Sequence, residues 1–244
     1  AASDVYKRQK ENWVGLGFMV GFITLLMICG YLKYQWKVRV ELPVQIYKTL
    51  GDSTSVKPLR IVAISDLHLG YGIGKKEFEG WVNTINAENP DIVLIAGDII
   101  DNSVRPLNEG NFAESFHKIK APLGIYACLG NHEFISGLKN SLDFYEKAGI
   151  HLLRDTAELV NNSFYVIGRD DRSNKWRKPL NVLVDSLDKS KPLILLDHQP
   201  YNLEETEAYG IDLQISGHTH QGQVWPISAI TNAIYEKDHG FVKK

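Results

Sequence analysis

Five short apolar runs, each followed by polar side chains of the kind that bind metals, constrain this sequence more than any other feature. The runs are rich in Val, Ile and Leu, as strands covered on both faces are. Their sequences are LRIVAIS (59–65), DIVLIAG (91–97), GIYACLG (124–130), PLILLD (192–197) and DLQIS (212–216). Helical stretches are expected between them, at 78–88, 112–119, 138–149 and 203–209. This alternation predicts an α/β fold whose first half is a largely parallel sheet.

The remaining segments are less regular. Strands are also expected within 151–169 and a helix near LNVLVDSLD (180–188). VRVEL (38–42) alternates like a further strand, and 51–58 (GDSTSVKP) is expected to be a polar linker.

Asp, Asn or His follows every one of the five runs, and five of the eight histidines lie in these motifs. In order they are Asp66-Leu67-His68, Gly97-Asp98, Gly130-Asn131-His132-Glu133, Asp197-His198 and Gly217-His218-Thr219-His220. Ligands of open α/β sheets bind beyond the carboxyl ends of the strands. On an extended segment, side chains at i and i+2 point the same way. Asp66 and His68 can therefore grip one centre together, and so can His218 and His220.

The donor atoms in these motifs are oxygen and nitrogen, without sulfur. Such a set suits Mn²⁺, Fe or Zn²⁺ rather than a closed structural zinc site. Taken singly, each motif has an ordinary reading as a turn, a cap or a surface loop. Their joint occurrence after five strands favours a binding site. Seven ligands exceed the needs of one tetrahedral ion and suit two ions about 3.5–4 Å apart that share a carboxylate.

In this order, D-x-H, G-D, G-N-H-E, a lone His and G-H-x-H resemble the signature of the calcineurin-like metallophosphoesterase superfamily, over about residues 59–225. DLHLG, GNHE and GHTHQGQ are most similar to its bacterial membrane-associated branch, which includes relatives of UDP-2,3-diacylglucosamine hydrolases. The resemblance implies a four-layer α/β/β/α sandwich. It also implies a dinuclear-metal phosphoesterase with two divalent ions (Mn²⁺, Fe or Zn²⁺).

The resemblance assigns a role to each position of the signature. Asp66, His68 and His220 would hold the first ion. Asn131, His198 and His218 would hold the second ion, and Asp98 would bridge the two. His132 would face the scissile phosphate as a proton donor or charge stabiliser, with Glu133 orienting it. A metal-bridging hydroxide would then attack a phosphate monoester or diester, either lipid-linked or nucleotide-linked.

Two other functions remain open at this stage. One is a catalytically silent scaffold of the same fold, although such members lose ligands and every ligand position is filled here. The other is a nuclease of the superfamily. The net charge of -2 provides no basic excess for nucleic-acid binding, so no nucleic-acid partner is expected. No GxSxG motif supports an acyl-transfer triad.

Residues 13–32 carry no charge and, as a helix, would span about 30 Å, the thickness of a bilayer core. Trp13, Tyr31, Tyr34 and Trp36 would lie at the two interfaces. The segment therefore predicts a transmembrane helix that anchors the chain in a bacterial cell membrane. The alternatives are a signal peptide and a buried core helix. The flanking positive charges balance, so the side of the membrane stays open.

The domain organisation follows from this division. Residues 1–12 form an N-terminal tail whose first nine residues resemble translated adapter sequence. Residues 13–32 span the membrane, and 33–58 hold a linker and a first strand. Residues 59–244 form the metallophosphoesterase domain, expected to be truncated at its C-terminus.

Two loops after the strands expected within 151–169 are ambiguous. Residues 168–172 (GRDDR) either place Arg169 or Arg172 over a substrate or form a self-satisfied salt-bridge loop. Residues 174–180 (NKWRKPL) are either a rim for an anionic substrate or membrane surface, or a solvated loop.

Overall fold

The computed structural model describes residues 2–48, 58–222 and 227–243, and only the backbone of residues 2–11. The chain divides into two compact units, residues 1–45 and residues 46–244. Most of the predicted linker at 51–58 lies outside the described residues.

The first unit is dominated by one long helix, α1 (Ala2–Gln35). Its Asn12–Gln35 segment is long and apolar enough to cross a membrane, judged by length and composition. The strand predicted at 38–42 is wrong: this segment forms no strand and pairs with none in the described part of the chain. Val38 and Val40 are 71% and 80% exposed, so the apolar face of the alternating pattern is not buried.

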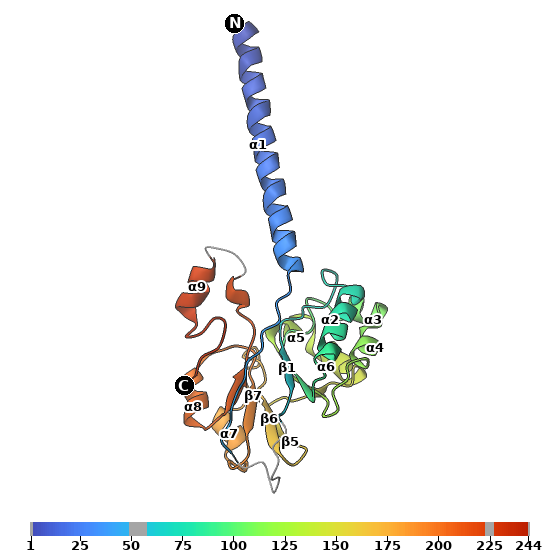
Figure 1. Cartoon of the computed structure of the whole chain (residues 1–244), viewed down its shortest axis with the longest axis vertical. Helices are drawn as coiled ribbons and strands as arrows, with labels where there is room; N and C mark the ends of the chain where they lie inside the picture. Colours follow the sequence, from blue (N-terminus) through green and yellow to red (C-terminus); the bar gives the residue numbers. More distant parts are fainter. Residues whose placement is uncertain (1, 49–57, 223–226, 244) are drawn as a thin grey trace. The chain divides into compact units, whose positions relative to one another are not determined.

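The second unit contains two four-stranded sheets (Figure 1). The first is all parallel, in the order β1 (Ile61–Ile64), β2 (Ile92–Ala96), β3 (Ile125–Cys128) and β4 (His151–Leu152). The second is ordered β5 (Thr156–Val160), β6 (Phe164–Gly168), β7 (Leu193–Leu196) and β8 (Leu213–Ile215). In the second sheet only the β5–β6 pairing is antiparallel.

Short helices connect the strands. Before β4 they are α2 (Lys75–Ala87), α3 (Arg105–Glu109), α4 (Phe112–Phe116), α5 (Asn131–Ile135) and α6 (Leu138–Lys147). After β6 they are α7 (Leu180–Val184), α8 (Leu203–Ala208), the 3₁₀ turn η1 (His220–Gly222) and α9 (Ile227–Ile234). The sequence pattern did not predict α3, α5 or α9. The first two have five residues each, which is too short to show a helical period.

Alternate side chains of each buried strand enter different layers of the core. Val93 and Ile95 of β2 pack with Phe78 of α2 and Phe116 of α4, while Ile92 and Leu94 of the same strand pack between the sheets. Because both faces of β2 are covered, all five of its residues are buried.

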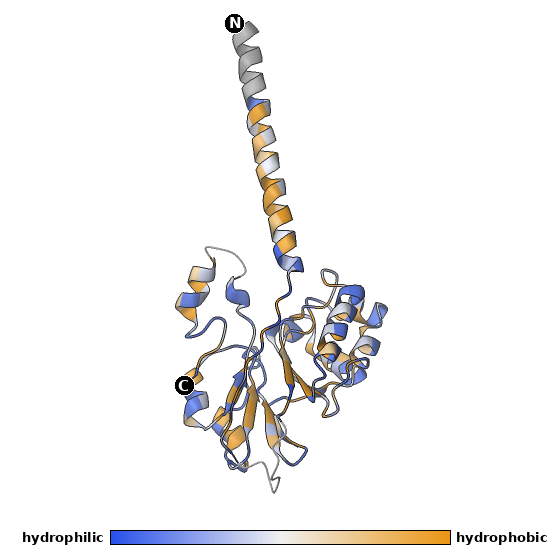
Figure 2. Ribbon diagram, in the orientation of Figure 1, coloured by the Kyte–Doolittle hydropathy of each residue, from blue (hydrophilic) through white to orange (hydrophobic). Residues whose placement is uncertain are grey.

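The second sheet repeats this arrangement. Ile194 and Leu196 of β7 face the first sheet, and Leu193 and Leu195 pack with Leu180 of α7. Within the second unit, apolar colouring accordingly concentrates on the strands (Figure 2). The layers are therefore α/β/β/α, which confirms the predicted fold class.

Strand direction decides where the polar motifs meet. The strands β1, β2 and β3 run parallel, as do β6, β7 and β8, so within each sheet their carboxyl ends lie at the same edge. The motifs that follow β1, β2, β3, β7 and β8 leave the sheets there.

Candidate metal centre

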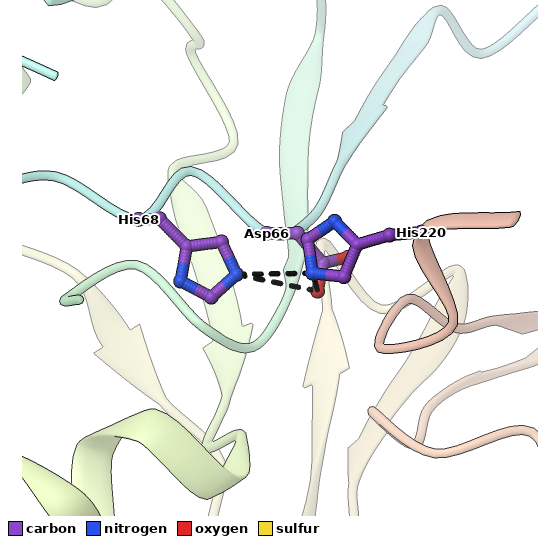
Figure 3. A group of neighbouring side chains, drawn as sticks. All are labelled: Asp66, His68 and His220. Atoms are coloured by element: carbon purple, nitrogen blue, oxygen red, sulfur yellow. Dashed lines mark hydrogen bonds and ion pairs between the residues drawn. The ribbon is translucent and has the colours of Figure 1, made fainter. Parts of the chain in front are cut away.

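Three side chains from opposite ends of the second unit point toward one another (Figure 3). Asp66 and His68 follow β1, and His220 lies in η1. The Nε2 atoms of His68 and His220 are 3.2 Å apart. Asp66 Oδ1 lies 3.4 Å from His220 Nε2 and 3.9 Å from His68 Nε2. These three donors form one group able to hold a cation.

A second group lies deeper and uses Asp98, His198 and His218. His198 Nε2 is 3.1 Å from Asp98 Oδ2 and 3.2 Å from the Asn131 amide oxygen. His218 Nδ1 approaches the same Asn131 oxygen at 2.9 Å. Asn131 therefore supplies a further donor between the two histidines.

Asp98 connects the two groups. Its Oδ2 lies 3.1 Å from His198 Nε2 and 3.7 Å from His68 Nε2, and the residue is only 1% exposed. All seven residues predicted as ligands are thus gathered at one place, with Asp98 facing both sides.

The rings of His218 and His220 belong to different groups, so these two residues do not share one set of donors although they are spaced i, i+2. The backbone is not extended there: φ is 72° at His218 and 48° at His220. Asp66 and His68 also have positive φ values, of 52° and 43°, although these two do share a group. Left-handed turns, rather than i, i+2 alternation, aim these side chains.

Two glycines let the carboxylates approach the backbone. A Cβ at Gly130 would overlap Asp98 Oδ1, and a Cβ at Gly217 would overlap Asp66 Oδ2. The backbone N–H of His218 also donates to Asp66 Oδ1 at 2.9 Å, and that of His132 to Asp98 Oδ1 at 2.9 Å. Each carboxylate is therefore fixed by the loop that follows another strand, which is β8 for Asp66 and β3 for Asp98.

The protonation states of His198 and Asp98 depend on each other. Burial by itself lowers the pKa of His198, but the hydrogen bond and charge of Asp98 outweigh it and raise the pKa to about 9. Burial would raise the pKa of Asp98, yet the same contact with His198 holds it below its usual value. The Nδ1–H of His198 donates to the Ala96 carbonyl at 2.7 Å, which leaves Nε2 facing the centre.

For two other histidines of the centre, the pKa is lowered instead of raised. Burial, with neighbouring imidazoles, lowers the pKa of both His68 and His218. Both rings are therefore biased toward the neutral form that binds metals.

His132 belongs to a third group of possible ligands, with His68 and Asp98, and does not enter the deeper group. Its Nδ1–H donates to the Asp101 carbonyl at 2.8 Å, so Nε2 is the nitrogen that stays available. The ring meets that of His68 edge to face, with centroids 4.5 Å apart. An Asp101 carboxylate oxygen lies 3.5 Å from His132 Nδ1 and 3.7 Å from His68 Nδ1. Sequence reasoning missed Asp101, although its place three residues after Gly97-Asp98 was a usable signal.

Glu133 has a different neighbourhood from the one expected. No hydrogen bond joins its carboxylate to the His132 ring among the described residues. The carboxylate instead accepts the backbone N–H groups of Asp98 and Ile100 at 3.1 Å and of Gly130 at 2.7 Å. Burial and the charge of Asp98 raise the pKa of Glu133 to about 7. Glu133 therefore ties the loop after β2 to the loop after β3.

A buried ion network lies under the His198 loop. Arg177 reaches both oxygens of Asp197, at 3.3 and 2.9 Å, and Arg169 lies 3.2 Å from the same carboxylate and 3.3 Å from Glu205. Arg169 is therefore paired, but with carboxylates outside the 168–172 loop. Trp176, which lies in the 169–177 loop with these two arginines, is 90% exposed.

An aromatic wall extends from the deeper group. The Tyr235 ring meets the His218 ring at 6.2 Å between centroids, and Tyr201 packs on Tyr235 at 4.8 Å. The guanidinium of Arg172 lies over the Tyr201 ring at 4.4 Å. Arg172 therefore belongs to this wall, whereas Arg169 is buried beneath the His198 loop.

The donor set fits divalent cations. Ligands about 2.0–2.2 Å from one ion lie roughly 3–3.5 Å from one another. Most of the nitrogen and oxygen separations above fall near that range. The arrangement can hold cations between carboxylate, amide and imidazole donors, with a free imidazole nitrogen of His132 beside them.

Comparison with known proteins points the same way. A sequence model of calcineurin-like phosphoesterases matches residues 59–222. An uncharacterized metallophosphoesterase of Aquifex aeolicus is 36% identical over 226 residues, which cover 90% of this chain and 84% of that protein. An uncharacterized metallophosphoesterase of Helicobacter pylori is 30% identical over 97% of this chain and 63% of its own length.

A third relative, from Danio rerio, is a transmembrane protein with metallophosphoesterase domain. It is 30% identical over 79% of this chain. The matched region is only 46% of that protein, so the similarity covers one portion of a longer relative.

Proposed function

Because this chain belongs to the calcineurin-like metallophosphoesterase family, we propose that it hydrolyses phosphate esters at the cluster described above. The observation that carries the proposal is the convergence of two donor groups on Asp98, with the free nitrogen of His132 beside them. A catalytically silent scaffold would have no need for every donor to be filled.

Asp66, His68 and His220 would hold one divalent cation, and Asn131, His198 and His218 the other, with Asp98 between them. Two cations in such a site acidify water, neutralise phosphate oxygens and orient the ester for in-line attack.

The chain's own groups would perform the remaining tasks. His132 Nε2 would donate a proton to the leaving oxygen, because its Nδ1–H is already committed to the Asp101 carbonyl. Glu133 would keep the Asp98 and Gly130 loops in register through their backbone N–H groups. Each role rests on a contact that does not depend on the bound cation.

We also propose that residues 13–32 anchor the protein in a membrane, that 33–58 connect the anchor, and that 59–244 carry the catalysis. Support comes from the apolar helix and from transmembrane relatives that carry the same domain. An anchored enzyme meets lipid-linked phosphates at high local concentration, which favours that substrate class over soluble nucleotides. The relatives found do not narrow the family to the UDP-2,3-diacylglucosamine hydrolase branch.

The test is hydrolysis of bis-p-nitrophenyl phosphate and p-nitrophenyl phosphate by the full chain in detergent, after metal removal and reloading with Mn²⁺, Fe²⁺ or Zn²⁺. Activity should depend on the added metal. His132→Ala should keep both ions and lose about 100-fold or more in rate, the usual contribution of general acid catalysis. Asp98→Ala should lose ions as measured by elemental analysis.

Absence of bound transition metal in the reloaded protein would overturn the proposal. Full activity of His132→Ala would remove that residue from the mechanism.

A further inference from the structure

We propose that α9 is a bilayer-docking helix that holds the mouth of the candidate centre against a lipid surface. The inference rests on the membrane attachment and the phosphoesterase activity proposed above. It adds a second contact with the membrane, made by the catalytic unit itself.

The outward face of α9 is an apolar ridge, defined here as Ile227, Ile230 and Ile234. These residues are spaced i, i+3 and i+7 and therefore lie on one face of the helix. Their exposed fractions are 48%, 55% and 58%, and no residue of α9 is buried. Nothing within the described residues covers the ridge.

A side of α9 next to the ridge, which carries Ser228 and Thr231, is fixed to the loop that carries His218 and His220. A Cβ at Gly222 of η1 would overlap the backbone nitrogen of Ser228, so the two segments touch directly. Tyr235, which follows the helix, packs edge-on against the His218 ring.

A pair of hydrogen bonds through Asp238 completes the attachment. The Thr231 hydroxyl on α9 donates to the Asp238 carboxylate at 3.0 Å, and the Thr219 hydroxyl, between the two histidines, donates to the Asp238 carbonyl. Binding of a surface to the ridge would therefore also hold the loop that carries His218 and His220, because α9 is bonded to that loop.

A bilayer is the occupant that the rest of the chain favours. Residues 36–60 join α1 to β1 and reach at most about 85 Å when fully extended. With α1 embedded, this tether keeps the second unit close to a lipid surface. Exposed isoleucines on a short amphipathic helix suit insertion at the headgroup boundary.

Charge does not supply the attraction. The segment 227–243 contains two lysines, Lys237 and Lys243, and two carboxylates, Glu236 and Asp238. The ridge should therefore bind zwitterionic and anionic bilayers alike, with little dependence on salt. Docking would present phosphate esters at the headgroup level to the loop that carries His218 and His220.

The test uses the full chain in phosphatidylcholine nanodiscs, in a Cys29→Ala background. The environment-sensitive fluorophore NBD is attached at Ile230→Cys, and Cys128 does not compete because it is fully buried. Asn232→Cys, on the opposite side of the helix, is the matched control. We expect the emission at position 230 to shift to the blue and to be quenched by lipids with a nitroxide in the headgroup region. The emission at position 232 should do neither.

The second arm compares two substrates of the same chemistry. With Mn²⁺ present, Ile230→Glu/Ile234→Glu should hydrolyse a bilayer-embedded p-nitrophenyl ester of phosphatidic acid at least about tenfold more slowly, which corresponds to about 1.4 kcal/mol. Its rate on soluble bis-p-nitrophenyl phosphate should stay within about twofold. Asn232→Glu should leave both rates unchanged.

Several results would overturn the docking. Equal emission at positions 230 and 232 would overturn it. A blue shift without nitroxide quenching would also overturn it, because a second copy or another protein would then cover the ridge. An equal fall in both rates would show that the ridge is needed for folding and not for docking. Failure of the chain to enter nanodiscs would overturn the attachment and the docking together. Absence of bis-p-nitrophenyl phosphate hydrolysis would overturn only the proposed reaction, because the labelling still decides the docking.

Discussion

At the scale of single residues, the centre depends on which nitrogen of each histidine is committed to the backbone. His198 and His132 each donate Nδ1–H to a carbonyl, of Ala96 and of Asp101. A carbonyl only accepts, so the proton on Nδ1 is fixed and Nε2 is directed by the fold. His218, in contrast, presents Nδ1 to Asn131. Neighbouring backbone groups thus decide the donor atom that each ring offers.

Asp101→Asn tests the restraint on His132. The variant keeps the backbone carbonyl but loses the carboxylate that lies 3.5 Å from His132 Nδ1. We expect kcat to fall about tenfold, as for other groups that orient a functional histidine. The loss should be larger for phenyl phosphate than for p-nitrophenyl phosphate, because the poorer leaving group needs the proton more.

The exposed residue Asp143 provides the control, since Asp143→Asn removes only a surface pair with Lys139. An equal loss for both substrates, together with a lower metal content, would mean that Asp101 acts through His68 instead.

His198 makes the stability of the metal-free protein depend on pH. Its pKa of about 9 in the fold exceeds the ordinary 6.5. The contribution is therefore fully present below pH 6.5 and is lost as the pH rises through about 9, with an upper limit of about 3 kcal/mol. In EDTA, Tm should fall between pH 6.5 and pH 9. His198→Gln should flatten this decline, and identical slopes in the two proteins would contradict the assignment.

At the scale of elements, the loops after the strands are held by groups that never face the substrate. Glu133 joins the loops after β2 and β3 through three backbone N–H groups. Asp197, directly before His198, is held by two arginines from the 169–177 loop. Burial raises the pKa of Asp197, whereas the charges of Arg177 and Arg169 oppose that rise. The two arginines therefore offset the free-energy cost of burying the charged Asp197 carboxylate beside the centre.

Arg177→Met tests this support. Loss of one partner leaves the Asp197 carboxylate buried and less well paired, which should lower the free energy of unfolding by about 3 kcal/mol in urea denaturation. Arg177→Met/Asp197→Leu should recover part of that loss, because no buried charge remains. Arg105→Met, at an exposed i, i+4 pair with Glu109, should change stability by less than about 0.5 kcal/mol. A loss no larger than that of Arg105→Met would argue against the role of the network.

At the scale of the whole molecule, residues 1–45, which contain α1, and residues 46–244 are separate compact units of one chain. The second unit has its own core, divided into three apolar clusters by the two sheets. The side chains of Asn12–Gln35, in contrast, are exposed. A lipid environment would satisfy this surface, as the proposed anchor requires.

Leu25→Arg/Leu26→Arg tests the anchor. Each arginine near the centre of a spanning helix costs about 2.5–3.5 kcal/mol on insertion scales. We expect the variant to leave the membrane fraction on alkaline carbonate extraction, whereas Val38→Arg/Val40→Arg, outside the span, should stay bound. Retention of both variants would show that α1 does not anchor the chain.

The sequence by itself determined the layering and the chemistry of the site. Runs such as 91–97 could only be strands covered on both faces, and parallel strands bring their carboxyl ends to one edge. That Asp66, Asp98 and Asn131 meet there follows from these two facts.

The residue pattern does not show how the donors are divided between the groups; the family resemblance assigned His218 and His220 to different ions, and only the tertiary structure gives the physical reason. His218 and His220 separate into two groups because left-handed backbone turns aim them apart, and a residue pattern of period two does not encode such turns. Asp101, the backbone contacts of Glu133 and the exposed ridge of α9 depend on segments distant in sequence. Local patterns specify which side chains are available, whereas contacts between remote segments fix what each one faces.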